Sequence, residues 1–245
     1  MVKNVDYESR RRSVLSATIN KYIQKACPVS SEDIAKEFDL SPATIRNIFS
    51  ELESAGYLTH PYTSGGRIPT DKGYRYYVDF LNSQMELLDE EKSRIMRAYN
   101  KSAKRLEDAL EETSEFISAS SRYTGIVSFL EWQDRLLYKG IGRILEQPEF
   151  KDSQKIKLLI NALEEKRRLL EIINRDFNDK VKVYIGQELG SDMADCSLVV
   201  SSYRKKKKPQ GKLAVLGPAR MEYDYIIPML AYISDALSDF LESIE

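Results

Sequence analysis

Hydrophobic positions recur at helical spacing along the first fifty residues. In residues 7–26 apolar side chains return every three or four positions from Val14 to Ile23, which predicts an amphipathic helix that ends before Pro28. A short second helix, SSEDIAKEF, follows with a serine cap and acidic residues in its first turn. Asp39-Leu40 then forms a tight turn, so the order is helix, turn, helix.

A third helix starts at Ser41, with Pro42 at its first helical position. Its apolar stripe, from Ile45 to Leu52, predicts the side that packs on the core. The opposite side is slim and polar, which suits entry into a DNA major groove, where Arg46 could reach guanine or phosphate and Asn47 adenine or phosphate. By itself this amphipathic pattern fits an ordinary surface helix equally well. The candidate contacts are Ser41, Ala43, Thr44, Arg46, Asn47 and Ser50.

A β-hairpin is predicted after Gly56, which is the expected stop of the third helix. Residues 57–59 form a short strand, a turn-rich loop follows, and residues 67–69 return the chain. Such a hairpin is a wing suited to a phosphate backbone or minor groove. Thr70 caps a fourth helix, whose N-terminus favours phosphate. The candidate contacts here are Tyr62, Thr63, Ser64, Gly65, Gly66, Arg67, Lys72 and Arg75.

Charge limits how this segment would bind DNA. The whole chain carries a net charge of -1, and residues 1–82 contain 11 Lys and Arg against 10 Asp and Glu, a net +1. Binding must therefore depend on the placement of a few cations rather than on a uniform field. No apolar run reaches the roughly 18 residues that span a bilayer, and the N-terminus has no apolar signal segment, so we expect a cytoplasmic protein without a membrane partner.

The chemistry of an enzyme is missing from the sequence. His60 is the sole histidine, and no nucleophile with a base, no pair of acids and no metal-ligand spacing accompanies it. We therefore expect no enzyme, no cofactor and no metal.

The remaining chain predicts an α+β fold. Residues 86–119 form a long helix that either packs on the following domain, which we favour, or makes a dimer contact. Strands are expected at residues 123–129, 136–140, 180–186, 196–203 and 213–216, with one helix at 153–177, a turn at 209–211 and a closing helix at 223–244.

Two polar features in this half have more than one interpretation. Arg204–Lys208 is a run of five cations, typical either of nucleic-acid contact or, the interpretation we favour, of a hairpin edge protected against aggregation. Arg220, beside Gly217-Pro218 at the start of the last helix, could bind an anion.

The chain resembles the HrcA family, the bacterial heat-inducible transcription repressors. The resemblance is carried by SPATIRN (41–47), GYL (56–58), TSGGRIPTDKGYRYYVD (63–79), ILEQPEF (144–150), VYIGQEL (183–189), DCSLVVSSY (195–203) and GPARMEYDYIIPML (217–230). It implies a homodimer that represses chaperone operons by binding double-stranded DNA at an inverted-repeat operator called CIRCE. It also implies that the chaperonin GroEL helps to keep the repressor active.

One departure concerns the second half. The family's GAF-like sheet is interrupted by an inserted dimerising domain, where this sequence has only EWQDRLL (131–137). The resemblance thus implies a winged helix-turn-helix at residues 1–82, a connecting helix at 83–120 and a reduced GAF-like α+β domain at 121–245, for dimerisation or sensing. The alternative is a winged-helix regulator of another regulon, controlled by a small-molecule ligand of the GAF-like domain.

Overall fold

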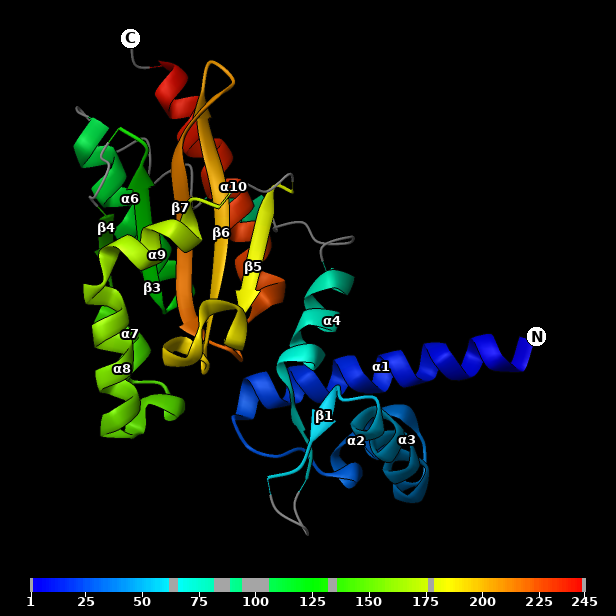
Figure 1. Ribbon diagram of the computed structural model, residues 1–245. Helices are drawn as coiled ribbons and strands as arrows, with labels where there is room; N and C mark the ends of the chain where they lie inside the picture. The colour runs from blue at the N-terminus through cyan, green and yellow to red at the C-terminus, as the bar shows by residue number, and fades with distance from the viewer. Residues whose placement is uncertain are drawn as a thin grey trace. The chain divides into compact units, whose positions relative to one another are not determined.

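The chain divides into two compact units, Met1–Ser83 and Gln84–Glu245. The computed structural model describes residues 2–61, 66–81, 89–93, 106–131, 136–175 and 179–243 (Figure 1). Within these ranges, no helix combines the length and the apolar character that crossing a membrane requires.

The first unit is a winged helix-turn-helix, as predicted. Its core is made by the apolar sides of the helices, with Leu15, Ile34 and Ile45 almost completely buried. The elements are α1 (Val2–Lys25), α2 (Ser31–Phe38), α3 (Pro42–Ser54), β1 (Leu58–Thr59), β2 (Ile68–Pro69) and α4 (Asp71–Leu81). Strands β1 and β2 pair antiparallel and form the base of the wing.

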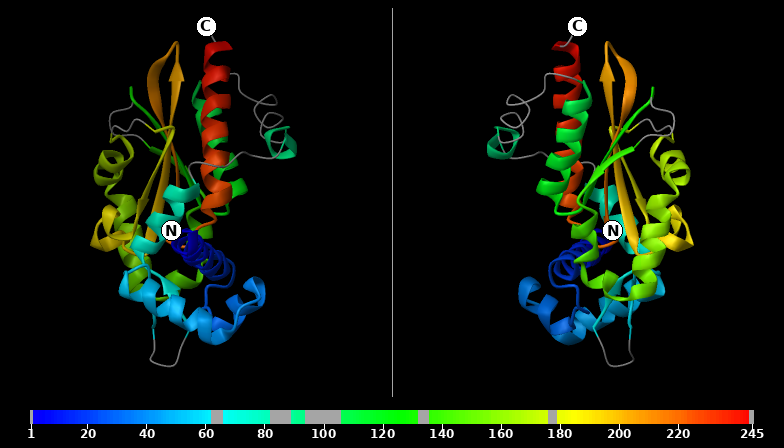
Figure 2. Two further views of the ribbon diagram at one scale, coloured as in Figure 1. Left: turned by 90° about the vertical axis from the view of Figure 1, so that its right-hand side faces the viewer. Right: turned by 90° about the vertical axis from the view of Figure 1, so that its left-hand side faces the viewer.

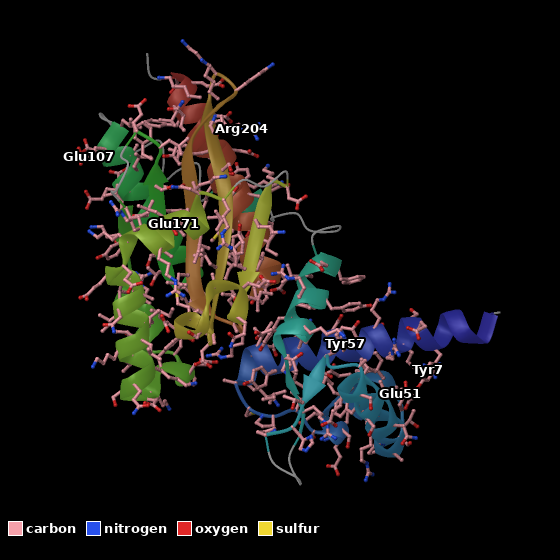
Figure 3. The ribbon with its side chains drawn as sticks, viewed as in Figure 1. Tyr7, Glu51, Tyr57, Glu107, Glu171 and Arg204 are labelled. Atoms are coloured by element: carbon pink, nitrogen blue, oxygen red, sulfur yellow. The ribbon has the colours of Figure 1, made fainter. Side chains whose placement is uncertain are left out.

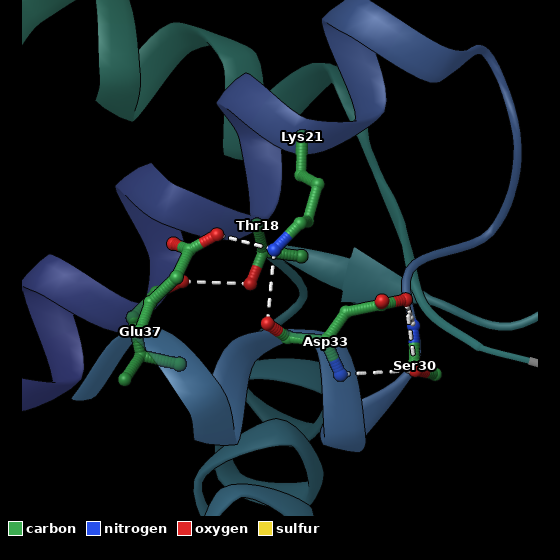
Figure 4. Close-up of polar contacts among 6 residues, drawn as sticks. Thr18, Lys21, Ser30, Asp33 and Glu37 are labelled. Atoms are coloured by element: carbon green, nitrogen blue, oxygen red, sulfur yellow. Dashed lines mark hydrogen bonds and ion pairs between the residues drawn. The ribbon is translucent and has the colours of Figure 1, made fainter. Parts of the chain in front are cut away.

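A capping box fixes the start of α2. The Ser30 hydroxyl accepts a hydrogen bond from the backbone N–H of Asp33 at 3.1 Å and donates one to the Asp33 carboxylate at 2.9 Å (Figure 4). This donation to the charged form is the main reason why the pKa of Asp33 lies below its ordinary value. Lys21 of α1 binds the carbonyl oxygen of Asp33 and the carboxylate of Glu37, so it joins α1 to α2.

The ends of α3 follow its sequence signals. Ser41 caps the start, because its side chain accepts from the backbone N–H of Thr44 at 3.1 Å. At the other end Gly56 has a left-handed backbone with φ +78°. The N–H of Tyr57 bonds the carbonyl of Leu52, and the N–H of Gly56 bonds that of Glu53, which is a Schellman motif. The helix length is therefore set by local chemistry.

The second unit is an α+β domain built on one antiparallel sheet. The strand order is β4-β3-β7-β6-β5, so the last strand of the unit lies beside its first. The elements are α6 (Leu106–Ser121), β3 (Thr124–Phe129), β4 (Leu136–Lys139), α7 (Ile141–Leu145), α8 (Ser153–Glu164), α9 (Lys166–Ile173), β5 (Val181–Ile185), β6 (Cys196–Lys205), β7 (Lys208–Pro218) and α10 (Tyr223–Ser243), with short 3-10 turns at Pro148–Lys151, Gly186–Leu189 and Ser191–Met193.

Helices cover both faces of this sheet (Figure 2). One face packs on α7, α8 and α9 through a cluster that includes Ile126, Leu198 and Leu216. The other face, which includes the buried residues Val199 and Val215, packs on α6 and α10. Because both faces of the sheet are covered, its strands are apolar along most of their length. The predicted α+β class is confirmed.

Helix α6 packs on the sheet through Leu110, Thr113 and Ile117, which are buried. This agrees with the interpretation that the long helical segment covers the domain. The predicted seam residues Ile95, Tyr99 and Ala103 lie outside the described residues.

The single helix predicted at residues 153–177 is wrong. The chain forms α8 and α9, which are separated at Glu165, where ψ is +59°. The residues around this break, EEKRR (164–168), are all charged and offer no apolar side chain to the core. A helical turn without apolar side chains is not stabilised by packing on the core, so nothing favours one continuous helix here. The two helices therefore pack on the sheet separately.

The turn predicted at residues 209–211 is also misplaced. Strands β6 and β7 stay paired to Lys205 and Lys208, and the turn is Lys206-Lys207. Both lysines have positive φ, +50° and +65°. Asn-Gly is the usual choice for two such positions, and a side chain with a Cβ there costs about 1 kcal/mol or more per residue. Pro209 lies opposite Arg204, at a register shift in the ladder, where proline is tolerated.

Candidate DNA-binding site

Helix α3 presents one continuous exposed stripe. Ala43, Arg46, Asn47 and Ser50 are all exposed, and their spacing places them on one side of the helix, opposite the buried Ile45, Ile48, Phe49 and Leu52. Small residues at both ends of the stripe leave Arg46 and Asn47 as its longest side chains. Arg46 makes one weak contact, from Nε to the carbonyl of Pro42 at 3.3 Å.

Three hydroxyls of the predicted site also serve the helix itself. The hydroxyls of Ser41 and Thr44 lie 2.8 Å apart, and the Ser50 hydroxyl donates to the carbonyl of Arg46 at 3.0 Å. These bonds hold the side chains close to the helix. They keep the stripe slim, as a helix that enters a groove requires.

The acidic residues of α3 have partners within the first unit. The Tyr7 hydroxyl of α1 donates to Glu51 at 2.7 Å, which is the main reason why the pKa of Tyr7 is raised (Figure 3). Glu53 binds Arg67 at 2.8 Å through one oxygen and the His60 ring through the other. Two carboxylates that would repel a phosphate backbone are therefore engaged by partners on other elements.

Glu53 joins α3 to the base of the wing. His60 follows β1 and Arg67 precedes β2, so one carboxylate contacts both ends of the loop between the strands. The side chains of Arg67 and Glu53 are only 22% and 25% exposed. Arg67, predicted as a DNA contact, thus has a structural role in the wing, and we name Glu53 with its two partners the wing clamp.

The backbone around Gly66 strengthens this anchor. Val29 and Arg67 exchange two backbone hydrogen bonds of 2.9 and 2.8 Å, which tie the wing to the segment before α2. A Cβ on residue 66 would lie 2.5 Å from the carbonyl oxygen of Val29, so glycine is required by close approach. The other predicted wing contacts, Tyr62, Thr63, Ser64 and Gly65, lie outside the described residues.

The two cations predicted on α4 also make internal contacts. The ammonium of Lys72 donates to the carbonyl of Ala55 at 2.8 Å and lies 4.8 Å from the centre of the Tyr57 ring. It therefore neutralises the C-terminal end of α3. Arg75 lies 4.0 Å from Asp79 of the same helix. The Thr70 hydroxyl accepts from the N–H of Gly73 at 3.1 Å, so the predicted cap is present.

One indirect signal of the wing clamp is present in the sequence. Glu51 and Glu53 lie in the last turns of α3, where the helix dipole disfavours negative charge. Acidic residues in this position are therefore expected to bind hydrogen-bond donors or cations of other elements. Tyr7, His60 and Arg67 supply them across 44, 7 and 14 residues of sequence, a separation that local patterns do not reveal.

The anion site proposed at Arg220 is contradicted by the structure. The Arg220 side chain is 10% exposed and binds the carboxylate of Glu149, and it also donates to Gln147 at 3.0 Å. Its charge is thus satisfied inside the second unit. Burial raises the pKa of the Cys196 thiol to about 12, so this group is not poised as a nucleophile. Among the described residues no cluster of metal-ligating side chains occurs.

Two family comparisons cover most of the chain. Residues 7–83 match the family described as "Winged helix-turn-helix transcription repressor, HrcA DNA-binding", and residues 96–227 match "HrcA protein C terminal domain". The chain belongs to the HrcA family. It is thus a transcription repressor with a winged helix-turn-helix DNA-binding domain, and the expectation that it is not an enzyme agrees with the family.

Curated HrcA relatives match over almost their whole length. The heat-inducible transcription repressor HrcA of Pelotomaculum thermopropionicum is 28% identical, with 97% of each chain covered. That of Geobacter sulfurreducens is 29% identical, covering 97% of this chain and 99% of the relative. The first alignment spans 339 positions, 94 more than the 245 residues present here. At least that many positions therefore have no counterpart, as expected for a shortened member.

A solved structure shares the HrcA fold seen here. It is a crystal structure of a hypothetical protein at 2.2 Å resolution, with a TM-score of 0.79, 19% identity, and 96% and 99% of the two chains covered.

Family membership across both units also disfavours the alternative of a metabolite-controlled regulator of another regulon. A surface hollow of about 520 Å³ lies in the second unit, and the described residues that line it, between Glu164 and Glu171, are charged.

Proposed function

We propose that this chain is a cytoplasmic repressor of chaperone genes that binds an inverted-repeat operator of the CIRCE type as a homodimer. The observation that carries the proposal is the exposed stripe of α3, in which Arg46 and Asn47 stand between small residues on a helix fixed at both ends. The names of the curated relatives support the heat-inducible repression of genes.

In this proposal α3 enters the major groove of each half-site. Arg46 would donate to guanine or phosphate, and Asn47 would pair with adenine or phosphate. The wing would lie on the adjacent backbone through residues 62–66, while the wing clamp sets its direction. Lys72, Arg75 and the N-terminus of α4 would add contacts to phosphate that do not depend on sequence.

A twofold dimer would present two copies of α3 to the two arms of an inverted repeat. The second unit would hold the two copies together. In this chain β3 and β4 pair directly with each other, and only residues 130–135 join them. Dimerisation would therefore use surfaces of the α+β unit itself rather than an inserted domain.

Heat would act on the amount of folded dimer. If the dimer is only marginally stable, modest heating lowers the population of the folded dimer that binds DNA, and a chaperonin such as GroEL would restore that population. Operator affinity should then fall steeply at heat-shock temperature and recover on addition of GroEL with ATP. An affinity that stays constant through that temperature without the chaperonin contradicts this part of the proposal.

The dimeric mode is tested by comparing an inverted repeat with a single half-site in a gel shift at fixed salt. A dimer should bind the repeat at least tenfold more tightly and with two protomers per duplex. Equal affinity for both duplexes, with one protomer on each, would contradict it.

A further inference from the structure

A second cationic surface lies on the hairpin between β6 and β7. Its tip, Arg204–Lys208, carries five positive charges in a chain whose net charge is -1. We propose that this tip, which we name the cationic tip, binds the phosphate backbone of duplex DNA outside the half-site read by α3. The inference rests on the proposed function, because the first unit must bring the DNA.

The cationic tip is a two-stranded ribbon that extends past its neighbours. The last bond to β5 is at Ser201, and β3 accompanies β7 only as far as Gly211. Lys205 and Lys208 still pair with each other beyond that point, so the ribbon continues (Figures 1 and 3). A ribbon of this kind projects its side chains away from the sheet.

The base of the ribbon is held firmly. Tyr203 is fully buried, and its hydroxyl donates to the carbonyl of Ser128 at 2.8 Å. The N–H of Arg204 donates to the hydroxyl of Ser238 on α10 at 3.0 Å. The tip is thus presented by a fixed support, which lowers the entropic cost of binding.

The tip also retains its charge. In the part of the chain that the structure describes, no carboxylate lies within 4.0 Å of the charged groups of Arg204, Lys206, Lys207 or Lys208. Elsewhere in the second unit cations do find acids, as Lys139 does with Glu111 at 2.7 Å. These four cations lie together at the end of the ribbon, and such a cluster attracts a polyanion; duplex DNA carries one charge per about 1.7 Å of its axis.

The turn residues separate this proposal from simple protection against aggregation. Lysines along a ribbon edge would protect it, but Lys206 and Lys207 occupy the apex, in left-handed conformations that favour Asn and Gly. Lysine at these two positions lowers the stability of the turn and places positive charge at the apex of the ribbon. Backbone strain of this kind is a sign of function.

The test replaces the apex with its preferred residues. Lys206→Asn with Lys207→Gly keeps the turn, removes two charges, and should raise the midpoint of thermal unfolding by a few degrees. Binding to duplex DNA of arbitrary sequence should weaken by roughly tenfold at physiological salt. The slope of log K against log salt should become shallower by about 1.8 per protomer.

A matched control removes two lysines elsewhere in the second unit, by Lys157→Gln with Lys166→Gln. It should leave both affinity and salt slope unchanged. Equal affinity and slope for the apex variant and the unsubstituted protein would overturn the proposal, and so would an equal loss in the control. Preference for an inverted repeat is measured in parallel. If that preference is missing while the apex variant still loses affinity, the proposed function fails and the cationic tip stands.

Discussion

The two units of this protein differ in how they distribute positive charge. In the winged helix-turn-helix unit, Arg67 binds Glu53, Lys72 caps the end of α3, and Lys21 joins α1 to α2. In the second unit, five consecutive cations stand together at one turn. The cations named in the first unit hold elements together, whereas the second unit, besides ion pairs such as Lys139 with Glu111, gathers five cations at one turn.

This contrast explains how a domain of near-neutral charge can belong to a DNA-binding family. Internal pairs fix the reading helix and the wing, so that a small number of side chains are correctly placed. Sequence reading then depends on geometry, whereas the cationic tip would add affinity without reading sequence.

The largest effect is expected for Arg46→Ala. Loss of a bidentate contact to a base should cost about 1–3 kcal/mol per half-site, or about 2–6 kcal/mol for a dimer on two half-sites, which is roughly 30-fold to more than 10,000-fold in operator affinity. Fluorescence anisotropy with operator and scrambled duplexes at one salt concentration measures it. Binding to the scrambled duplex should change far less. Normal operator affinity for the variant would remove Arg46 from the interface.

The wing clamp gives the next largest effect, because placement and charge predict opposite signs. Glu53→Gln removes a negative charge near DNA, which alone would tighten binding, but it also weakens the attachment of His60 and Arg67, at the wing base, to α3. We expect the second effect to dominate and operator affinity to fall by about 3–10-fold, or 0.7–1.4 kcal/mol.

Glu51→Gln is the matched control for the wing clamp. It removes the same charge from the same helix, but Glu51 contacts Tyr7 rather than the wing. Its operator affinity should stay within about twofold of the unsubstituted protein or rise slightly. Tighter binding by both variants would mean that charge, and not the wing clamp, decides.

Acid should release the capping box of α2. The pKa of Asp33 is lowered in the folded state, so its contribution to stability is complete above the unfolded-state value of about 3.9 and is lost as pH falls through the folded value. Asp33→Asn should therefore cost about 1 kcal/mol at neutral pH and almost nothing in strong acid. Urea titrations across pH measure this, with Glu32→Gln as the control. A cost that does not change with pH would refute the role of the carboxylate.

Lys72→Ala should have the smallest effect, about 0.5–1 kcal/mol in unfolding free energy, since it uncovers the C-terminal carbonyl of Ala55 at the end of α3. Binding to all duplexes should weaken equally and slightly, with a salt slope reduced by at most about 0.9. A loss confined to the operator would instead give Lys72 a role in reading sequence.

Local chemistry made much of this fold readable from the sequence. The caps at Ser41 and Thr70 and the stop at Gly56 each depend on residues within a few positions, and all three are present. The strands of the second unit followed from apolar runs, because both faces of the sheet are covered.

Nonlocal contacts account for what the sequence did not show. The partners of Glu53 come from both ends of the wing, and the ion pair of Arg220 with Glu149 spans 71 residues. The turn at Lys206-Lys207 contradicts local preference, so a rule based on Pro and Gly placed it at 209–211 instead. Such a departure is expected where function outweighs stability.

The central claim is that α3 reads DNA as part of a twofold dimer. Sequencing the DNA that the purified protein selects from a random pool tests it most directly. We expect an enriched inverted repeat whose arms are contacted equally, and an Arg46→Ala protein that no longer enriches it. Enrichment of a single asymmetric site, or the same enrichment by the Arg46→Ala protein, would contradict it.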